Sequence, residues 1–551
     1  MSAAHRVASR MSREMHHPHD GDTIGDEVLE LLDAVRDAMR LLARRRGSVE
    51  ARLLFTQVDL VVTVVQGIVA DRVFARDLDE LDGENYRDWL IRHGLDPMTQ
   101  VAGIPQGYPN TALSYEYGDT TAIPTMSATA WLTFFIRQMG GVGAGAYFFR
   151  RGTGETVMRP LYEVLRDRGV RFHFFHRLRQ VEVDGDRVTA LHFEVQATTK
   201  DGEYRPLRPL RPDADGRTEL VWPDRPLYDQ LVQGDDLRTG KVNLESWWSD
   251  WQAPATLELR VDRTEHGFEH VVLATPVATL PITCAAMLQH SVHGQRWEQM
   301  CEGVRTAATQ AAQLWLDRPV TQLGWSRAGT TSATDRHVGG FYAQDMTSAC
   351  DFSDLIEHER WGRDSGQVPQ GLVYLIGALP DPEPIPDFTD TEYPRRMEER
   401  VRWATVQFLR DVSGLMPGAV NRANPTDARS FDFGLLVQHD GVERLGVNRF
   451  DTQYWRANID PNERYTLTVA HTMQHRMKGW ENGFDNLVLA GDWTYTGFNI
   501  GSFEGAVMSG KLAALALVGR PVITTIWGYD FLHPGLQGPP APRIAMPSPA
   551  A

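Results

Sequence analysis

Residues 486–519, NLVLAGDWTYTGFNIGSFEGAVMSGKLAALALVG, decide how the rest of the chain is interpreted. A short apolar strand is expected at 487–490, followed by a Gly-Asp turn and a loop of small residues. A helix is expected to begin near Ser502, whose hydroxyl can cap it, and to end at Gly519. A strand that leads into a glycine-marked helix N-terminus presents unpaired N–H groups and partial positive charge to whatever lies in front of it.

This arrangement resembles the C-terminal FAD motif of the superfamily of flavin-containing amine oxidases, phytoene desaturases and protoporphyrinogen oxidases. The match follows residue type, order and spacing over about thirty positions. Ordinary strand–helix packing would explain the apolar residues, but not Gly491-Asp492 followed by Asn499, Gly501 and Glu504. The resemblance implies FAD as cofactor and hydride transfer from an organic substrate.

The resemblance also assigns roles to positions. Asp492 would accept a hydrogen bond from the flavin's ribityl chain, and the backbone at 500–502 would face the pyrimidine edge of the ring. The strand that begins at Leu178 would line the adenine. The cofactor-binding residues implied are Gly491, Asp492, Trp493, Asn499, Ile500, Gly501, Ser502, Leu178, Ala274 and Thr275, and those on the substrate side are Tyr454, Trp455 and Tyr495. No catalytic side chain is identified, and no metal site is expected.

The family's first phosphate-binding half is missing from the pattern. Its members open with a strand–GxGxxG–helix unit that holds the FAD pyrophosphate, and none precedes the helical region that starts near Asp26. The glycine cluster at 140–145 has the wrong spacing and is interpreted as a turn. Three accounts stay open: a partner subunit carries the GxGxxG half, the chain is a fragment, or flavin has been lost. The polar leader, residues 1–25, favours the partner.

One difference from the family pattern bears on the type of reaction. Many amine oxidases of this superfamily place a lysine near the flavin, whereas Gln310 or Gln313 occupies that neighbourhood here. A dehydrogenase or desaturase acting on a C–C or C–N bond is therefore favoured. The alternatives are a strict amine oxidase that produces hydrogen peroxide and a non-catalytic scaffold that has lost flavin. The substrate, the electron acceptor and the stoichiometry stay open.

Composition is typical of a large soluble enzyme. The 551 residues carry a formal net charge of −16, which argues against nucleic acid or an anionic membrane as the main partner. Three widely spaced cysteines indicate a reducing cytoplasm. The apolar run 53–74 is interrupted by Gln57, Asp59 and Gln66, so a buried helix is expected there and not a membrane span.

The fold expected is mixed α/β: an incomplete FAD-binding Rossmann-like domain of glutathione-reductase type, interleaved with a substrate domain of mixed sheet and helices. Tryptophans 247, 248 and 251 are expected to pack under a loop. The segments expected are a flexible leader (1–25), a helical substrate-side region (26–150), FAD-domain segments (151–194, 265–290 and 483–520), an insertion (195–264), the substrate domain (291–482) and a proline-rich tail (521–551).

Overall fold

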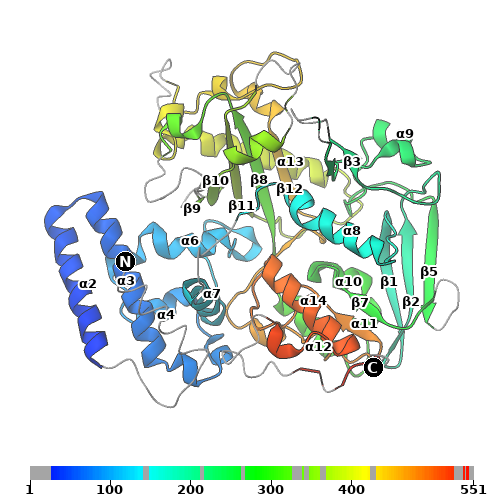
Figure 1. Cartoon of the computed structure of the whole chain (residues 1–551), viewed down its shortest axis with the longest axis horizontal. Helices are drawn as coiled ribbons and strands as arrows, with labels where there is room; N and C mark the ends of the chain where they lie inside the picture. Colours follow the sequence, from blue (N-terminus) through cyan, green and yellow to red (C-terminus); the bar gives the residue numbers. More distant parts are fainter. Residues whose placement is uncertain are drawn as a thin grey trace.

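The chain folds as a mixed α/β protein in the computed structural model (Figure 1). The structure describes residues 26–140, 148–210, 216, 218–261, 267–325, 338–340, 346–359, 361, 368–421, 430–526, 538–539 and 541–544. The expected leader, most of the expected glycine turn at 140–145 and most of the expected tail lie outside these residues.

Helices and strands alternate along the chain after an all-helical first part. The helices are α2 (Asp26–Arg46), α3 (Val49–Ala70), α4 (Tyr86–Arg92), α5 (Pro97–Gln100), α6 (Gly103–Thr111), α7 (Ala128–Gly140), α8 (Arg159–Asp167), α9 (Gly234–Thr239), α10 (Leu280–Thr283), α11 (Ala285–Leu288), α12 (Gly294–Gly303), α13 (Tyr393–Arg410) and α14 (Phe503–Val518). The strands are β1 (His176–Asp184), β2 (Arg187–Val195), β3 (Arg208–Pro209), β4 (Leu220–Val221), β5 (Ala255–Val261), β6 (Gly267–Phe268), β7 (Val271–Leu273), β8 (Thr306–Leu316), β9 (Val338–Gly340), β10 (Ser348–Asp351), β11 (Gly371–Leu379), β12 (Tyr454–Asn458), β13 (Tyr465–Thr466) and β14 (Leu487–Leu489).

The apolar run at 53–74 forms the long helix α3, as expected. The Ser48 hydroxyl caps it by accepting a hydrogen bond from the Ala51 N–H at 3.2 Å. Asp59 is fully buried inside it and accepts a hydrogen bond from the Asp96 N–H at 3.0 Å. By length and composition alone, residues 49–75 could cross a membrane, but 56% of the most apolar window is buried in the protein. A core helix meets the same criteria.

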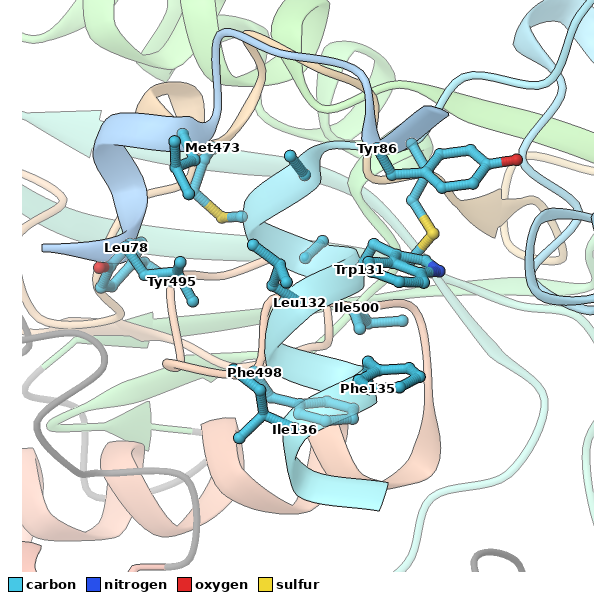
Figure 2. Packing of buried hydrophobic residues seen from close by; sticks show 14 of the residues in the cluster. Leu78, Tyr86, Trp131, Leu132, Phe135, Ile136, Met473, Tyr495, Phe498 and Ile500 are labelled. Atoms are coloured by element: carbon cyan, nitrogen blue, oxygen red, sulfur yellow. The ribbon is translucent and has the colours of Figure 1, made fainter. Parts of the chain in front are cut away.

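The helical part shares one hydrophobic core with the end of the chain (Figure 2). Trp131, Leu132 and Phe135 of α7 pack there against Phe498 and Ile500. Met508, Leu512 and Ala516 of α14 belong to the same core. The terminal motif is therefore fixed by residues that lie several hundred positions earlier in the sequence.

Two larger sheets flank this core. The four-stranded sheet has the order β1-β2-β5-β6, and its first hairpin turns at Gly185-Asp186, between the paired residues Asp184 and Arg187. The six-stranded sheet has the order β12-β8-β11-β10-β9, with β13 paired to the start of β8. α13 packs against this second sheet through buried residues that include Met397 and Val401.

A short parallel pair, β7 and β14, joins the second and third of the expected FAD-domain segments. Leu487 pairs with Val271, and Leu489 with Leu273. α14 begins after the Ser502 cap and ends at Gly519, which has a φ of +72°. These boundaries confirm the strand and helix expected at the terminal motif.

The sequence also predicts a strand at 171–175, before the strand that begins at Leu178, and this prediction is wrong. Residues 171–175 form no strand, because no described segment pairs with them along their length. Phe172 and Phe174 instead pack their rings on Tyr162 of α8. The tryptophans of the insertion do pack as expected: Trp247 and Trp248 are buried in the core of the six-stranded sheet, and the Trp251 indole donates to the Gln196 carbonyl.

Candidate functional site

The parallel pairing of β7 and β14 brings two distant segments to one edge of a sheet. Ala274 and Thr275 directly follow β7, and Gly491 and Asp492 follow β14 after one intervening residue, Ala490. Parallel strands end at the same edge, and ligands of open α/β sheets bind outside these carboxyl ends. Four of the expected cofactor residues therefore share one location.

Trp493 ties the two strand ends together. Its side chain is 1% exposed, and its indole Nε1 donates to the Thr275 carbonyl at 3.1 Å. The ring folds back over Gly491, where a Cβ would lie 2.2 Å from the indole nitrogen. Gly491 has a φ of +150°, which L side chains rarely adopt. The structure thus places Trp493 in the core beneath the site.

Asp492 lies at the mouth of α14. It accepts hydrogen bonds from the Thr466 hydroxyl at 3.2 Å and from the Ser502 backbone N–H. Burial raises the pKa of this carboxyl, while Arg476, Thr466 and Ser502 oppose the rise. A carboxylate has about four lone-pair positions, so these two donors leave capacity for a further hydroxyl.

Two polar side-chain atoms close to the site have no hydrogen-bond partner among the described residues. Ser502 accepts a hydrogen bond from the Gly505 N–H at 3.1 Å. Asn499 is fully buried with a φ of +54°, and its Oδ1 accepts from the Thr496 N–H at 2.8 Å. The Asn499 Nδ2 and the Thr275 Oγ1 are buried without a hydrogen-bond partner in the described part of the chain. Such groups are costly unless a ligand or water meets them.

The groups that come close to the Gly501 backbone belong to the protein's own strand β13. A Cβ at Gly501 would lie 2.4 Å from the Thr466 carbonyl oxygen and 3.0 Å from the Tyr465 ring. The Tyr465 hydroxyl donates to the Gly501 carbonyl at 2.6 Å. Burial raises the pKa of this hydroxyl, which keeps it a donor. Sequence reasoning missed Tyr465 and Thr466, since a two-residue strand carries no local signal.

Arg476 is a second residue that the sequence did not reveal. Its Nη1 donates to the Asp492 carbonyl at 2.5 Å, and its Nη2 donates to the Leu467 carbonyl at 3.2 Å. Burial lowers the pKa of this guanidinium to about 10, although Asp492 and Asp82 oppose the change. One arginine in a loop resembles any other in the sequence. Only the fold shows that this one is buried behind the Gly-Asp turn.

The expected substrate-side residues do not gather at this edge. Tyr454 pairs with Gln313 on β8, whereas Thr466 of the site pairs with Thr306, seven residues away. That separation is roughly 23 Å along an extended strand. Trp455 stacks on Phe450, with ring centroids 5.1 Å apart.

Tyr495 points away from the two strand ends, toward the helical part. Its hydroxyl donates to Asp79, and burial together with that carboxylate raises the pKa of the phenol. It lines a cavity of about 440 Å³ with Asp79, Asp82, His471 and Arg476.

Leu178 and Gln310 take positions on the two larger sheets. Leu178 lies on β1 and packs against the core that contains β7 and β14. Gln310 is 2% exposed on β8, and its Nε2 donates to the Ala378 carbonyl at 2.9 Å. The resemblance sets a lysine in this region, and the structure has a buried amide there.

The residues of the edge fit the flavin end of FAD. A carboxylate with spare acceptor capacity stands beside a helix N-terminus, and two buried donors, Asn499 Nδ2 and Thr275 Oγ1, lack partners within the described residues. The isoalloxazine and ribityl groups offer carbonyl oxygens and hydroxyls that match this set. Asp492 would hold the ribityl chain, and the α14 mouth would face the ring.

Comparison with known proteins gives a family match and a similar solved structure. The model of the flavin-containing amine oxidoreductase family matches residues 214–518, more than half of the chain. A solved structure of an oxidoreductase from Methanosarcina mazei is similar at 10% identity and a TM-score of 0.38, covering 78% of this chain and 67% of that one. No curated protein matches the chain.

Proposed function

The chain belongs to the flavin-containing amine oxidoreductase family, and we propose that it is the substrate-binding subunit of an FAD-dependent oxidoreductase. The subunit oxidises a C–C or C–N bond of an organic substrate. Bound FAD supplies the hydride acceptor. The observation that carries the proposal is the shared edge of β7 and β14, where Asp492 meets the N-terminus of α14.

The residues of the edge have separate tasks. The Asp492 carboxylate accepts a ribityl hydroxyl, and Arg476 fixes the Gly-Asp turn through the Asp492 carbonyl. The N-terminus of α14 supplies partial positive charge, worth about 0.3–1 kcal/mol at a surface and up to about 2 kcal/mol when partly buried. That charge favours the anionic, reduced form of the ring.

A partner subunit supplies the pyrophosphate-binding half in this proposal. Two points support it: the sequence shows no strand–GxGxxG–helix pattern, and no third strand pairs with β7 or β14 among the described residues. The complex is cytoplasmic in the proposal, which is supported by the free thiols of Cys284, Cys301 and Cys350.

A dehydrogenase or desaturase is favoured over a strict amine oxidase. The supporting observation is the buried amide of Gln310 in the region where many family members have a lysine. The assay offers amines and unsaturated apolar substrates with oxygen alone, and then with an artificial dye as electron acceptor. Dye reduction without hydrogen peroxide supports the dehydrogenase. Peroxide formed from amines would establish the amine oxidase.

Asp492→Ala tests the site. Loss of one charge-assisted hydrogen bond costs about 1.5–3 kcal/mol, so we expect FAD affinity to fall by about ten- to a hundredfold. The measurement is the flavin content of the purified complex and a fluorescence titration with FAD. Asp235→Ala is the control, since that side chain is 97% exposed. Equal flavin content in both variants would remove Asp492 from the site.

A scaffold without flavin is the second candidate function. The observation that favours it is the close contact of Gly501 with the protein's own Thr466 carbonyl, which uses part of the helix mouth internally. The same titration decides between the two: a chain that binds no FAD, alone or with its partner, is a scaffold.

A further inference from the structure

Within the described part of the chain, the parallel pair of the site has one covered edge and one open edge. On the outer edge of β14, the Leu489 N–H donates to the Gly479 carbonyl at 2.9 Å, and the Leu487 carbonyl accepts from Asn482 Nδ2 at 2.8 Å. β7 pairs only with β14 among the described strands. Val272 of β7 is 47% exposed, although its pairing partner Val488 is fully buried. Parallel sheets are normally covered on both faces, so this sheet ends prematurely at β7.

α14, which packs against β14, has an apolar side that the described residues leave exposed. Its inner side packs over Val488 through Met508 and Leu512. Its outer side carries Phe503, Val507 and Gly510, at spacings that align on one face of a helix. Val507 is 53% exposed, and a Cβ at Gly510 would meet no atom within 4 Å. A helix that is apolar all round is normally buried.

α8 and its flanks expose a second apolar surface. Within residues 158–173, all of which the structure describes, only Tyr162 is buried. Met158, Leu161 and Leu165 lie on one face of the helix, and Leu161 is 54% exposed. Phe149, which precedes α8 in the chain, contacts α14: the Phe149 and Phe503 rings meet edge to face with centroids 6.1 Å apart. Figure 1 shows α8 and α14 in the same part of the molecule.

The charge of this surface is opposite to that of the chain. Residues 148–179 hold eight arginines and three acidic residues, whereas the whole chain has a net charge of −16. Arg150, Arg168 and Arg171 are exposed. The positive charge of this surface therefore complements a partner surface that carries acidic side chains.

We propose that the open edge of β7, the outer side of α14 and the exposed face of α8 form one docking surface for the partner subunit. The partner adds a strand parallel to β7 and lays an apolar helix against Val507 and Gly510, and it presents acidic side chains to the arginines of 148–179. This inference rests on the proposed function.

The open edge argues for a protein and against a lipid surface. Exposed backbone N–H and C=O groups of a strand are satisfied by another strand, which a membrane does not offer. A strand added parallel to β7 ends at the same edge as Ala274 and Asp492. The glycine turn and helix N-terminus that follow such a strand then face the phosphates of the shared cofactor.

Site-specific photo-crosslinking in the native host tests the surface. Val507 and Val272 are each replaced by p-benzoylphenylalanine in the full chain, and Trp403 of α13, which is 58% exposed, is the control position. We expect positions 507 and 272 to give one and the same adduct, a polypeptide that mass spectrometry shows to contain a strand–GxGxxG–helix unit. The control position gives no such adduct. Adducts with lipid, with a second copy of this chain or with a protein that lacks the unit would overturn the proposal, as would no adduct.

A substitution separates the docking surface from the function. Val507→Asp changes an exposed side chain, so we expect an unchanged melting temperature of the isolated chain and at least a tenfold loss of partner in pull-downs of the complex. A partner crosslinked at 507 and 272 in a colourless complex would leave the surface standing and end the flavin proposal. A yellow complex in which neither position crosslinks to the partner would support the flavin proposal and overturn the proposed docking surface.

Discussion

At the scale of single residues, two glycines of the terminal motif differ in what surrounds them. Gly501 has no Cβ because the Thr466 carbonyl and the Tyr465 ring occupy that space. Gly510 lies inside α14, with open space where a Cβ would be. The sequence marks both as glycine, so only their neighbours tell a packing requirement from a free position.

These two glycines give opposite predictions. We expect Gly501→Ala to destabilise the isolated chain by about 1–3 kcal/mol, because the new methyl group forces β13 away from the mouth. Gly510→Ala should stabilise it by up to about 1 kcal/mol, since alanine is the better helix former. Urea unfolding followed by circular dichroism measures both. Equal effects of the two substitutions would contradict the close contact at Gly501.

At the scale of elements, a carboxylate at the end of α3 holds α4 in place. Asp71 accepts hydrogen bonds from Trp89 Nε1 at 2.7 Å and from both Arg92 Nη atoms, at 3.0 and 2.9 Å. Burial raises the pKa of Asp71, but the bonds from Arg92, Trp89 and His93 outweigh it and hold the pKa at about 2. The helical part of the chain thus depends on an ionised side chain where two helices meet.

Asp71→Asn should therefore have a pH-dependent effect. A carboxyl whose pKa is lower in the folded state than its ordinary 3.8 stabilises the fold fully above pH about 4, and this contribution is lost as pH falls toward about 2. We expect a loss of about 1–2 kcal/mol at pH 7, after allowance for solvent screening. Unfolding free energies from pH 7 to pH 3 measure it. A difference from the wild type that stays constant down to pH 3 would contradict the assignment.

At the scale of the whole molecule, Trp248 fixes the segment between β4 and β5 to the rest of the fold. Trp248 is 2% exposed and lies between Phe388 and Tyr393, with ring centroids at 5.0 and 4.8 Å. Its indole donates to the Pro386 carbonyl at 3.3 Å. This contact joins the segment after β4 to the core of the six-stranded sheet.

Removing this anchor should weaken the whole fold. We expect Trp248→Ala to cost about 3–5 kcal/mol, because it leaves a large cavity in a closed core. Trp403→Ala, at a side chain that is 58% exposed, should stay within about 0.5 kcal/mol. Guanidinium unfolding followed by circular dichroism tests both. A small effect at Trp248 would show that the segment is not packed into that core.

By itself, the sequence determined the elements with strong local signals. The cap at Ser502, the end at Gly519 and the apolar run of α3 predicted their own structure, since caps and periodicity act over a few residues. The tertiary structure alone decided which groups surround Asp492, because Thr466 and Arg476 reach it through contacts that no local pattern encodes. It also decided that residues 171–175 form no strand and that most of α8 stays exposed. A strand or an amphipathic face needs a neighbour to pair with or pack against, and whether that neighbour is present is a property of the fold.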